Sequence, residues 1–294
     1  MFAPISAFIV TKNEEARLRR TLAALRPWVD EIVLVDSGSS DRTVDIARSM
    51  DARVFCREWN GYGNQKRFAE QQCRNDWVLN VDADEVVTPG LADEICALFD
   101  AERHPEPGGY RIRILTVYPG DEKPRPFAHD YNVVRLYHKA VGQYRSHAIF
   151  DRVMIDSALI RQLGKPIYHY SCVSLAHIIE KNNNFSSFRT EASPLRSRRS
   201  TMVRLWFEFP FSFVKSYFFR RHCTGGWKGF YFSLCYAFLR TTMIAKMLER
   251  ASSADKPQAA SVVQLPRFNS SRRLAIKAAE QSSPVQGSTG AHPF

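Results

Sequence analysis

The chain has 294 residues, of which 45% are hydrophobic and 24% are charged, and its formal net charge is +11. That hydrophobic fraction is ample for a folded core and excludes a chain that is disordered throughout. The six cysteines include no CxxC pair, so neither a zinc site of that spacing nor a disulfide framework is expected, and they are interpreted as reduced core residues.

Strands and helices are predicted to alternate through the first part of the chain. Residues 5–10 form an apolar run typical of a buried strand, and Leu18, Leu22 and Leu25 lie on one face of the helix that follows. Asn13 is suited to cap that helix. The further predicted elements are strand 31–35, helix 42–50, strand 53–56, helix 64–73 and strand 76–81. Such alternation implies crossover connections and therefore an α/β fold, a mostly parallel sheet with helices on both faces.

Polar residues follow three of the predicted strands. Thr11, Asp36 and Asp82 each come at or just after the carboxyl end of a strand. In open α/β sheets, ligands bind in the crevice outside these ends. Polar groups from three strands are therefore expected around one crevice.

Two carboxylates one residue apart, Asp82 and Asp84, follow the apolar run 77–79. At the end of a strand, alternate residues point to the same side, so both could reach one divalent cation. Like charges this close repel each other unless a cation or a basic group lies between them. The pair predicts a metal and diphosphate site, although an isolated Asp-x-Asp is a weak signal.

Four motifs occur in order at residues 9–15, 35–43, 61–66 and 76–85. They read Ile-Val-Thr-Lys-Asn-Glu-Glu, Val-Asp-Ser-Gly-Ser-Ser-Asp-Arg-Thr, Gly-Tyr-Gly-Asn-Gln-Lys and Asp-Trp-Val-Leu-Asn-Val-Asp-Ala-Asp-Glu. Together they resemble a family 2 glycosyltransferase with the GT-A fold. Within that family the chain is most similar to the WaaE/KdtX type, the lipopolysaccharide core sugar transferases. A thinner similarity continues toward residue 250.

The resemblance implies a role for each motif residue. Thr11 and Asp36 would line the uracil pocket, with Asp36 accepting from the base N–H. Lys66 would face the diphosphate, and Asp82 would contact the ribose. A divalent metal, Mn²⁺ or Mg²⁺, would be held by Asp84, with Asp82 as its partner ligand.

Asn13 and Glu14 belong to the first motif, so the resemblance places them among the nucleotide-sugar-binding residues. Each also has an ordinary local interpretation, since Asn13 could cap the helix and Glu14 could favour its positive end. For Asp41 we favour a helix N-cap over a ligand contact.

The resemblance also implies a single inverting displacement, which requires one general base, typically a carboxylate downstream of the metal motif. We predict Asp151, although the sequence departs from the subgroup there because Phe150 stands where histidine is usual. A surface carboxylate paired with Arg152 is the alternative interpretation, and Asp130 is the other candidate base. His169 is expected to be a structural or acceptor-site histidine, with a metal-ligand role left open.

Residues 185–250 interleave aromatic side chains with twelve Lys or Arg and three acidic residues. This composition fits nucleic acid or an anionic membrane, and we favour the membrane because no nucleic-acid motif is recognised. The longest uncharged run, 229–239, falls short of the roughly 20 residues of a spanning helix, so the segment should lie on the membrane. Helices packed on the catalytic domain or in a dimer are the alternative.

The predicted organisation is a catalytic domain at 1–184, an amphipathic helical segment at 185–250 and a disordered tail at 251–294. Met1 leads within a few residues into the first strand, so no signal peptide is expected. The predicted location is the cytoplasm, peripherally on the inner face of the cytoplasmic membrane.

The predicted function is inverting sugar transfer from a nucleotide-sugar donor, a UDP-hexose, to a lipid-linked glycan of the lipopolysaccharide core. Polyprenyl phosphate or a protein is an alternative acceptor. A nucleotide-binding dehydrogenase is disfavoured because the first turn, residues 11–15, lacks G-x-G-x-x-G. A non-catalytic membrane adaptor would not need polar residues at matching strand ends.

Overall fold

The computed structural model describes residues 3–99, 105–128, 130–147, 151–191, 193 and 197–254. The described residues up to Ala251 belong to one compact unit. The predicted tail lies outside the described residues from residue 255 onward. The domain division at residue 184 stays a prediction, and that position falls inside a helix.

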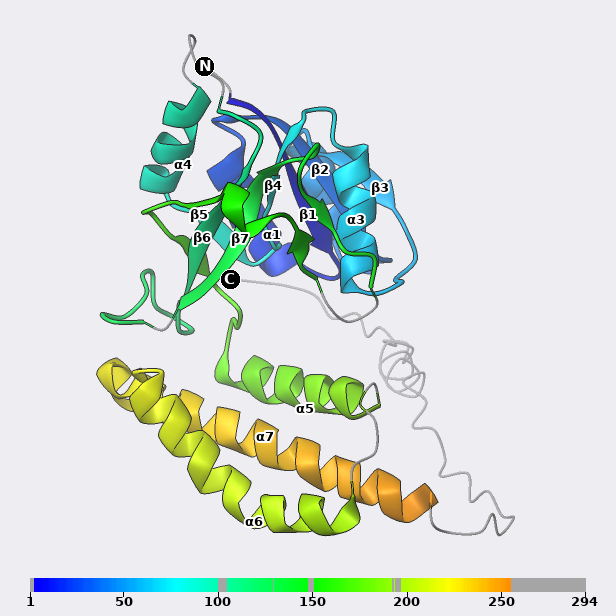
Figure 1. Ribbon diagram of the computed structural model, residues 1–294, viewed down its shortest axis with the longest axis vertical. Coiled ribbons are helices and arrows are strands. Elements are labelled where there is room, and N and C mark those ends of the chain that lie inside the picture. Colours follow the sequence, from blue (N-terminus) through cyan, green and yellow to red (C-terminus); the bar gives the residue numbers. More distant parts are fainter. Residues whose placement is uncertain are drawn as a thin grey trace, which may run out of the picture. The chain divides into compact units, whose positions relative to one another are not determined.

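The first half of the chain has the predicted alternation of strands and helices. Its elements are β1 (Ala3–Thr11), α1 (Glu15–Leu25), β2 (Val29–Asp36), α2 (Thr43–Ser49), β3 (Arg53–Cys56), α3 (Tyr62–Gln72) and β4 (Trp77–Asn80). β1 pairs in parallel with β2 on one side and β4 on the other, and β3 pairs in parallel with β2. The predicted parallel sheet is confirmed, with boundaries that differ by one or two residues (Figure 1).

The second half extends this sheet with strands of both directions. Its elements are β5 (Glu85–Val87), α4 (Pro89–Cys96), η1 (Ala97–Phe99), β6 (Gly109–Thr116), β7 (Asp130–His138), β8 (Gln143–Tyr144), β9 (Val153–Met154), η2 (Ser157–Leu159), β10 (Ile160–Gln162) and β11 (Ile167–His169). The order across the sheet is β3-β2-β1-β4-β7-β6-β11-β5, with β10 beside β6. β7 lies antiparallel between β4 and β6. It therefore brings its side chains next to the end of β4.

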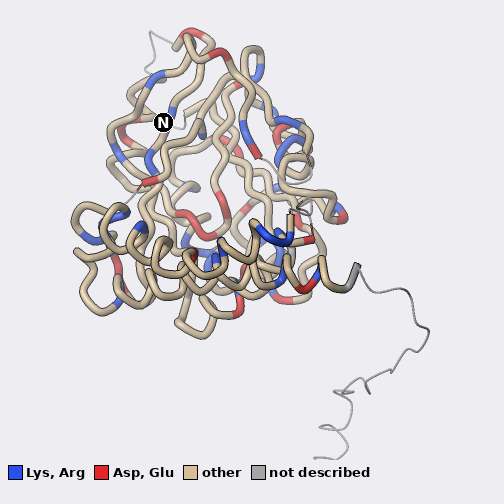
Figure 2. The backbone as a smooth tube through the Cα atoms, turned by 60° about the horizontal axis from the view of Figure 1, so that its bottom comes forward, with Lys and Arg blue, Asp and Glu red and all other residues tan. Residues whose placement is uncertain are grey.

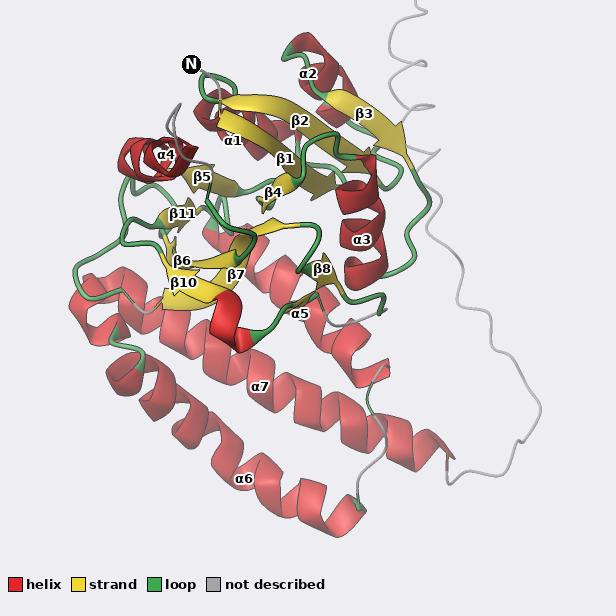
Figure 3. Cartoon of the chain, turned by 45° about the horizontal axis from the view of Figure 1, so that its top comes forward, coloured by secondary structure: helices red, strands yellow, loops and turns green. Residues whose placement is uncertain are grey.

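Both faces of the central strands are buried. Ile5, Ala7 and Ile9 of β1 pack with α1, α2 and α4, whereas Phe8 packs on the other face with α3. Figure 3 shows α3 on the opposite side of the sheet from α1 and α2. The leucines of α1 that were predicted to form its apolar stripe are fully buried in the first cluster. Two-sided burial explains why these strands are continuously apolar instead of alternating.

The prediction that Asn13 caps α1 is wrong. Glu14 occupies the N-cap position, and Asn13 has a φ of 55°, which points its side chain away from the helix. The side-chain Oδ1 of Asn13 instead accepts a hydrogen bond from the Ser40 backbone N–H at 2.8 Å. Asp41 accepts from the N–H of Thr43, the first residue of α2, and from that of Glu15, the first residue of α1. Asp41 thus links the starts of two helices, a structural role like the one we favoured.

Three long helices follow the sheet. They are α5 (Leu175–Glu191), α6 (Arg198–Val214) and α7 (Gly226–Ala254), with the π-helical turn η3 (Lys215–Phe219) and the short η4 (His222–Gly225) between the last two. α5, α6 and α7 lie side by side in Figure 1 and Figure 3. The Tyr118 hydroxyl lies 2.6 Å from His222 Nδ1, and Lys228 donates to the Pro119 carbonyl oxygen at 3.0 Å. These contacts attach the helices to the loop after β6.

The helical segment leaves large apolar side chains in solvent. Figure 2 shows long uncharged stretches there, interrupted by short charged ones. Seven aromatic side chains on α6, η3 and α7 are more than half exposed: Trp206, Phe207, Phe211, Phe218, Phe219, Trp227 and Phe238. Within the described part of the chain, no helix combines the length and apolar character needed to cross a membrane.

Candidate active site

The ends of β1, β2 and β4 meet at one edge of the sheet, as the sequence predicts. Thr11 and Asp36 are paired neighbours in the register of β1 and β2, and Asp82 follows β4 by two residues. A cavity of about 800 Å³ opens beside them. The described residues that line it are Val10, Thr11, Lys12, Glu14, Trp59, Tyr62, Lys66, Asp82, Ala83, Asp84, Asp151, His169, Lys181 and Asn184. We refer to it as the donor cavity, after the sugar donor that the sequence motifs predict.

Two of the predicted nucleotide-binding residues do not line the donor cavity. Asp36 is 2% exposed, and its carboxylate accepts hydrogen bonds from the backbone N–H groups of Gly38 and Ser39, both at 2.9 Å. Asn13 is held to Ser40 as described above. Both shape the loop between β2 and α2, and their contact with a nucleotide stays a prediction.

Thr11 has a feature that fits a ligand. Its side chain is 4% exposed, and its Oγ1 is among the buried polar atoms that find no hydrogen-bond partner within the described residues. A buried hydroxyl without a partner costs free energy, so native structures rarely keep one unless a ligand or water satisfies it. The unpartnered hydroxyl is consistent with the predicted nucleotide contact of Thr11.

Asp82 belongs to a buried group of charges. Its two carboxylate oxygens lie 2.9 Å from Lys66 Nζ and 2.9 Å from Arg135 Nη2. Arg135 also contacts Glu85 at 2.6 Å. Burial alone would raise the pKa of Asp82, but the charges of Arg135 and Lys66 outweigh it and hold that pKa well below the usual range. Burial raises the pKa of Glu85 despite Arg135.

Asp84 contacts a separate group of basic residues. Its Oδ2 lies 3.2 Å from His169 Nε2, 3.3 Å from Arg17 Nη1 and 3.9 Å from Lys181 Nζ. Burial would raise the pKa of Asp84, but its hydrogen bond and charge interaction with His169 lower it overall. Burial would lower the pKa of His169, and Asp84 raises it overall. His169, for which the sequence left a metal-ligand role open, thus faces Asp84.

The two carboxylates of the motif take different partners because the strand stops short of them. β4 ends at Asn80, and residues 83 and 84 form a turn, so the alternation of a strand no longer applies. Among the described residues, no group of three or more His, Cys, Asp and Glu side chains is arranged to hold a metal. Joint binding of one cation by Asp82 and Asp84 stays a prediction.

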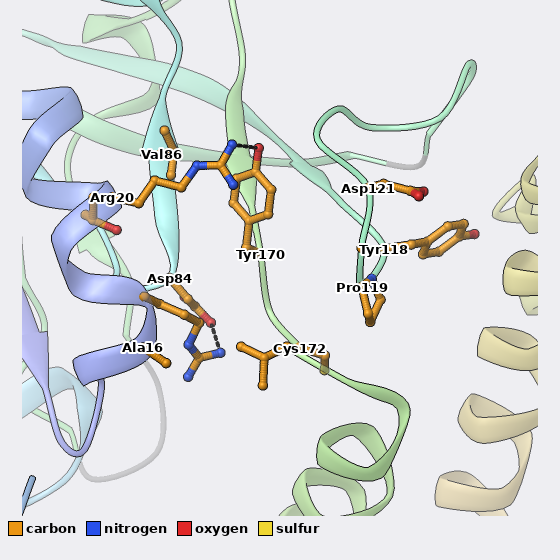
Figure 4. Close-up of a pocket in the computed structure, with 13 residues that line it drawn as sticks. Ala16, Arg20, Asp84, Val86, Tyr118, Pro119, Asp121, Tyr170 and Cys172 are labelled. Atoms are coloured by element: carbon orange, nitrogen blue, oxygen red, sulfur yellow. Dashed lines mark hydrogen bonds and ion pairs between the residues drawn. The ribbon is translucent and has the colours of Figure 1, made fainter.

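Figure 4 shows a further pocket, of about 350 Å³, on the α1 side of Asp84. Arg20 extends across it and donates to the Tyr170 hydroxyl at 2.7 Å, with its guanidinium 3.9 Å from the centre of that ring. Arg17 lines this pocket and pairs with Asp84, which lines both this pocket and the donor cavity. Asp84 is therefore held from both sides.

Asp151 lies where the donor cavity meets another. Its Oδ2 is 2.8 Å from Lys66 Nζ, and its side chain is 43% exposed. A second cavity, of about 700 Å³, lies between β6, β7 and residues 151–160. We refer to it as the acceptor cavity, after the role that we propose for it below. Asp82, Asp151 and His169 line both cavities, whereas Asp130, the other candidate base, lines neither.

Lys66 lines the donor cavity and is already paired with two carboxylates. It is 4% exposed and bridges Asp82 and Asp151, so its ammonium already has two carboxylate partners. Burial would lower the pKa of Lys66, but Asp82 raises it overall, so the side chain stays charged. Contact of Lys66 with a diphosphate stays a prediction. In the structure, the Lys66 ammonium holds the Asp151 carboxylate in position through their ion pair.

Several residues of the site had no usable signal in the sequence. Arg135 reaches Asp82 from β7, 53 residues away, and Lys181 reaches Asp84 from α5. Trp59 and Tyr62 line the donor cavity as an edge-to-face aromatic pair with ring centres 4.7 Å apart. Tyr62 was visible only as part of a glycine-flanked turn. These contacts depend on strand order and loop path, which local patterns do not specify.

The mostly parallel sheet, with a polar cavity at its strand ends, has the architecture that the sequence predicts for a transferase of the GT-A class. The model of the family described as glycosyl transferase family 2 matches residues 6–157. A protein of Rickettsia prowazekii (strain Madrid E), named uncharacterized glycosyltransferase RP128, is 36% identical over 83% of this chain and 86% of its own length. The chain belongs to glycosyl transferase family 2, and it is an enzyme.

Further similarities are more distant. The lipopolysaccharide core biosynthesis glycosyltransferase LpsC of Rhizobium meliloti (strain 1021) is 28% identical over 86% of this chain and 95% of its own length. Among solved structures, S. aureus TarS 1-349 is 15% identical over 90% of this chain and 95% of its own, with a TM-score of 0.43. Glucosyl-3-phosphoglycerate synthase from Mycobacterium tuberculosis, in complex with Mn²⁺ and uridine-diphosphate-glucose, is 25% identical over 40% of this chain and 45% of its own, with a TM-score of 0.30.

Proposed function

We propose that this enzyme transfers a sugar with inversion from a nucleoside diphosphate donor, a UDP-hexose, to a lipid-linked glycan of the lipopolysaccharide core. The observation that carries the proposal is the position of Asp151 at the junction of the donor and acceptor cavities. A general base for this reaction must reach the acceptor hydroxyl on the side of the anomeric carbon opposite the leaving diphosphate. Of the three residues that line both cavities, Asp82 has both oxygens paired with Lys66 and Arg135, and His169 faces Asp84, which favours Asp151 as the base.

The proposed chemistry is one displacement. Asp151 takes the proton of the acceptor hydroxyl while that oxygen forms a bond to the anomeric carbon and the bond to the diphosphate breaks. Lys66, at 2.8 Å, keeps the Asp151 carboxylate turned toward the junction. Thr11 would bond the nucleobase with its unpartnered hydroxyl, and Asp82 would face the ribose.

The residues present fit a divalent metal at Asp84. Asp84 Oδ2 faces His169 Nε2 at 3.2 Å and also contacts Arg17 and Lys181, whereas Asp84 Oδ1 has no hydrogen bond or ion pair within the described residues and stays open to an ion. A carboxylate oxygen and an imidazole nitrogen are both suitable ligands for Mn²⁺, whereas Mg²⁺ prefers oxygen. Asp84 and His169 would hold the ion, with diphosphate oxygens completing the set. When bound, the ion would stabilise charge on the departing diphosphate. Asp82 is a weaker candidate ligand because Lys66 and Arg135 already occupy its oxygens.

The acceptor and the location rest on two further observations. The relative LpsC is named for lipopolysaccharide core biosynthesis, which favours that acceptor over polyprenyl phosphate or a protein. The exposed aromatic side chains of α6, η3 and α7 would enter the interface of the cytoplasmic membrane on its inner face. Lys215 and Arg221, which have no ion-pair partner within the described residues, would meet anionic lipid headgroups.

A donor and acceptor screen tests the proposal. Purified protein is incubated with Mn²⁺ or Mg²⁺ and a panel of UDP-sugars, with ADP-heptose as a control donor, and nucleotide release is measured with and without deacylated lipopolysaccharide core. We expect release with one UDP-sugar to rise when the core acceptor is added. Release from ADP-heptose alone would contradict the proposed donor class, and release stimulated only by polyprenyl phosphate would contradict the proposed acceptor.

A further inference from the structure

Not every charged residue that lines the acceptor cavity has a partner of opposite charge within the described residues. Asp82 and Glu85 are paired with Arg135, and Asp151 is paired with Lys66. His169 is paired with Asp84. Two more arginines, Arg111 and Arg152, also line the cavity. Neither guanidinium has a hydrogen-bond or ion-pair partner anywhere in the described part of the chain.

The two arginines reach the cavity from different elements. Arg111 is an outward-facing residue of β6, opposite Val134 of β7. Arg152 immediately precedes β9. Between them the wall is mainly apolar or uncharged, and it includes Val134, Ile155 and Ser157. The three carboxylates of the described lining contact Arg135 or Lys66, and none of them contacts Arg111 or Arg152.

Arg152 is the residue next to the proposed base. Consecutive Cα atoms are about 3.8 Å apart, so Asp151 and Arg152 enter the cavity within the width of one sugar ring. A group that Arg152 binds would belong to the sugar carrying the reacting hydroxyl or to its direct neighbour. A guanidinium presents paired N–H donors that match a carboxylate or a phosphate group.

We propose that the acceptor cavity recognises an anionic sugar, whose carboxylate or phosphate group is bound by Arg111 and Arg152. This inference rests on the proposed function and names the chemistry of the acceptor at the same site. It assigns the two arginines to acceptor recognition, while Asp151 acts on the hydroxyl. Both side chains are solvent-accessible, so an anion can reach them without rearrangement of the fold.

The probe is the deacylated lipopolysaccharide core oligosaccharide in untreated, dephosphorylated and carboxyl-reduced forms. Binding to the full chain saturated with UDP and Mn²⁺ is measured by calorimetry, and sugar transfer is measured separately. We expect one of the two treatments to weaken wild-type binding at least about tenfold, which identifies the anionic group as phosphate or carboxylate.

The variants are Arg111→Gln with Arg152→Gln, the same pair changed to Lys, and Arg161→Gln as a matched control. Arg161 is an exposed arginine of β10, next to β6, and it does not line the acceptor cavity. We expect the Gln pair to bind charged and neutral forms with equal affinity, the Lys pair to recover part of the preference, and the control to keep it. Thermal unfolding of each variant reports whether it is folded.

The outcomes separate the two proposals. Equal binding of all three forms by the wild type, or a preference that survives in the Gln pair, would overturn the anionic subsite. Charge-dependent binding without transfer would support the subsite and contradict the proposed reaction. Failure to bind any form would contradict both.

Discussion

Replacing Lys66 with Met removes the ammonium that contacts both Asp82 and Asp151 while keeping most of the apolar stem. Breaking a buried ion pair from one side costs about 3–5 kcal/mol. Two features reduce that figure: Arg135 still holds the other oxygen of Asp82 at 2.9 Å, and Asp151 is 43% exposed and regains water. We therefore expect the free energy of unfolding to fall by about 2 kcal/mol, which corresponds to about 4–8 °C in melting temperature.

Thermal and urea unfolding of Lys66→Met measure this loss, with Lys123→Met as the matched control. Lys123 is an exposed lysine in the loop after β6, and a surface change of this kind is worth about 0.5 kcal/mol or less. We also expect kcat to fall about tenfold, because Asp151 loses the contact that orients it. The reasoning would be refuted if the melting temperatures of Lys66→Met and the control differed by less than about 1 °C, which corresponds to roughly 0.5 kcal/mol or less.

Three more predictions follow from the donor cavity and the helices. Asp84→Asn should reduce kcat/KM by about 10² and remove its dependence on Mn²⁺, whereas full wild-type activity in EDTA would rule out the proposed metal. Thr11→Val should weaken UDP binding about tenfold, and it should also stabilise the free protein slightly because a buried hydroxyl without a described partner is removed; calorimetry and thermal unfolding check both. Changing Trp206, Phe219 and Trp227 together to Ser should reduce flotation with anionic liposomes, and high salt should weaken wild-type flotation without abolishing it; unchanged flotation of the triple variant would rule out this surface.

The first half of the fold follows from the sequence because each strand and helix there carries its own local signal. Apolar runs without alternation indicated strands buried on both faces, and β1, β2 and β4 have that environment. The order of the later strands carries no such signal. β7 lies between β4 and β6 because it pairs with β4, whose residues Trp77 to Leu79 lie far from their partners His138 to Leu136 in the chain, and local patterns do not encode such pairing.

For the site, the sequence predicted which residues lie at the strand ends but not which residues contact them. The strand ends placed Thr11 and Asp82 at one edge of the sheet, and the structure puts both beside the donor cavity. The partners of these residues were not predictable, because Arg135 contacts Asp82 only after β7 has paired with β4. Asn13 shows a different limit: its side chain is a good helix cap, but the tight turn at φ 55° directs it to Ser40.

Substitution of Asp151 tests the central claim most directly. Asp151→Asn keeps the size of the side chain but cannot accept a proton, so we expect kcat to fall by about 10² to 10⁴ while UDP binding measured by calorimetry is nearly unchanged. Asp130→Asn, at a carboxylate that lines neither cavity, is the control and should keep wild-type kcat. A large loss of kcat in Asp130→Asn with little loss in Asp151→Asn would contradict the assignment of the base and the junction of cavities on which it rests.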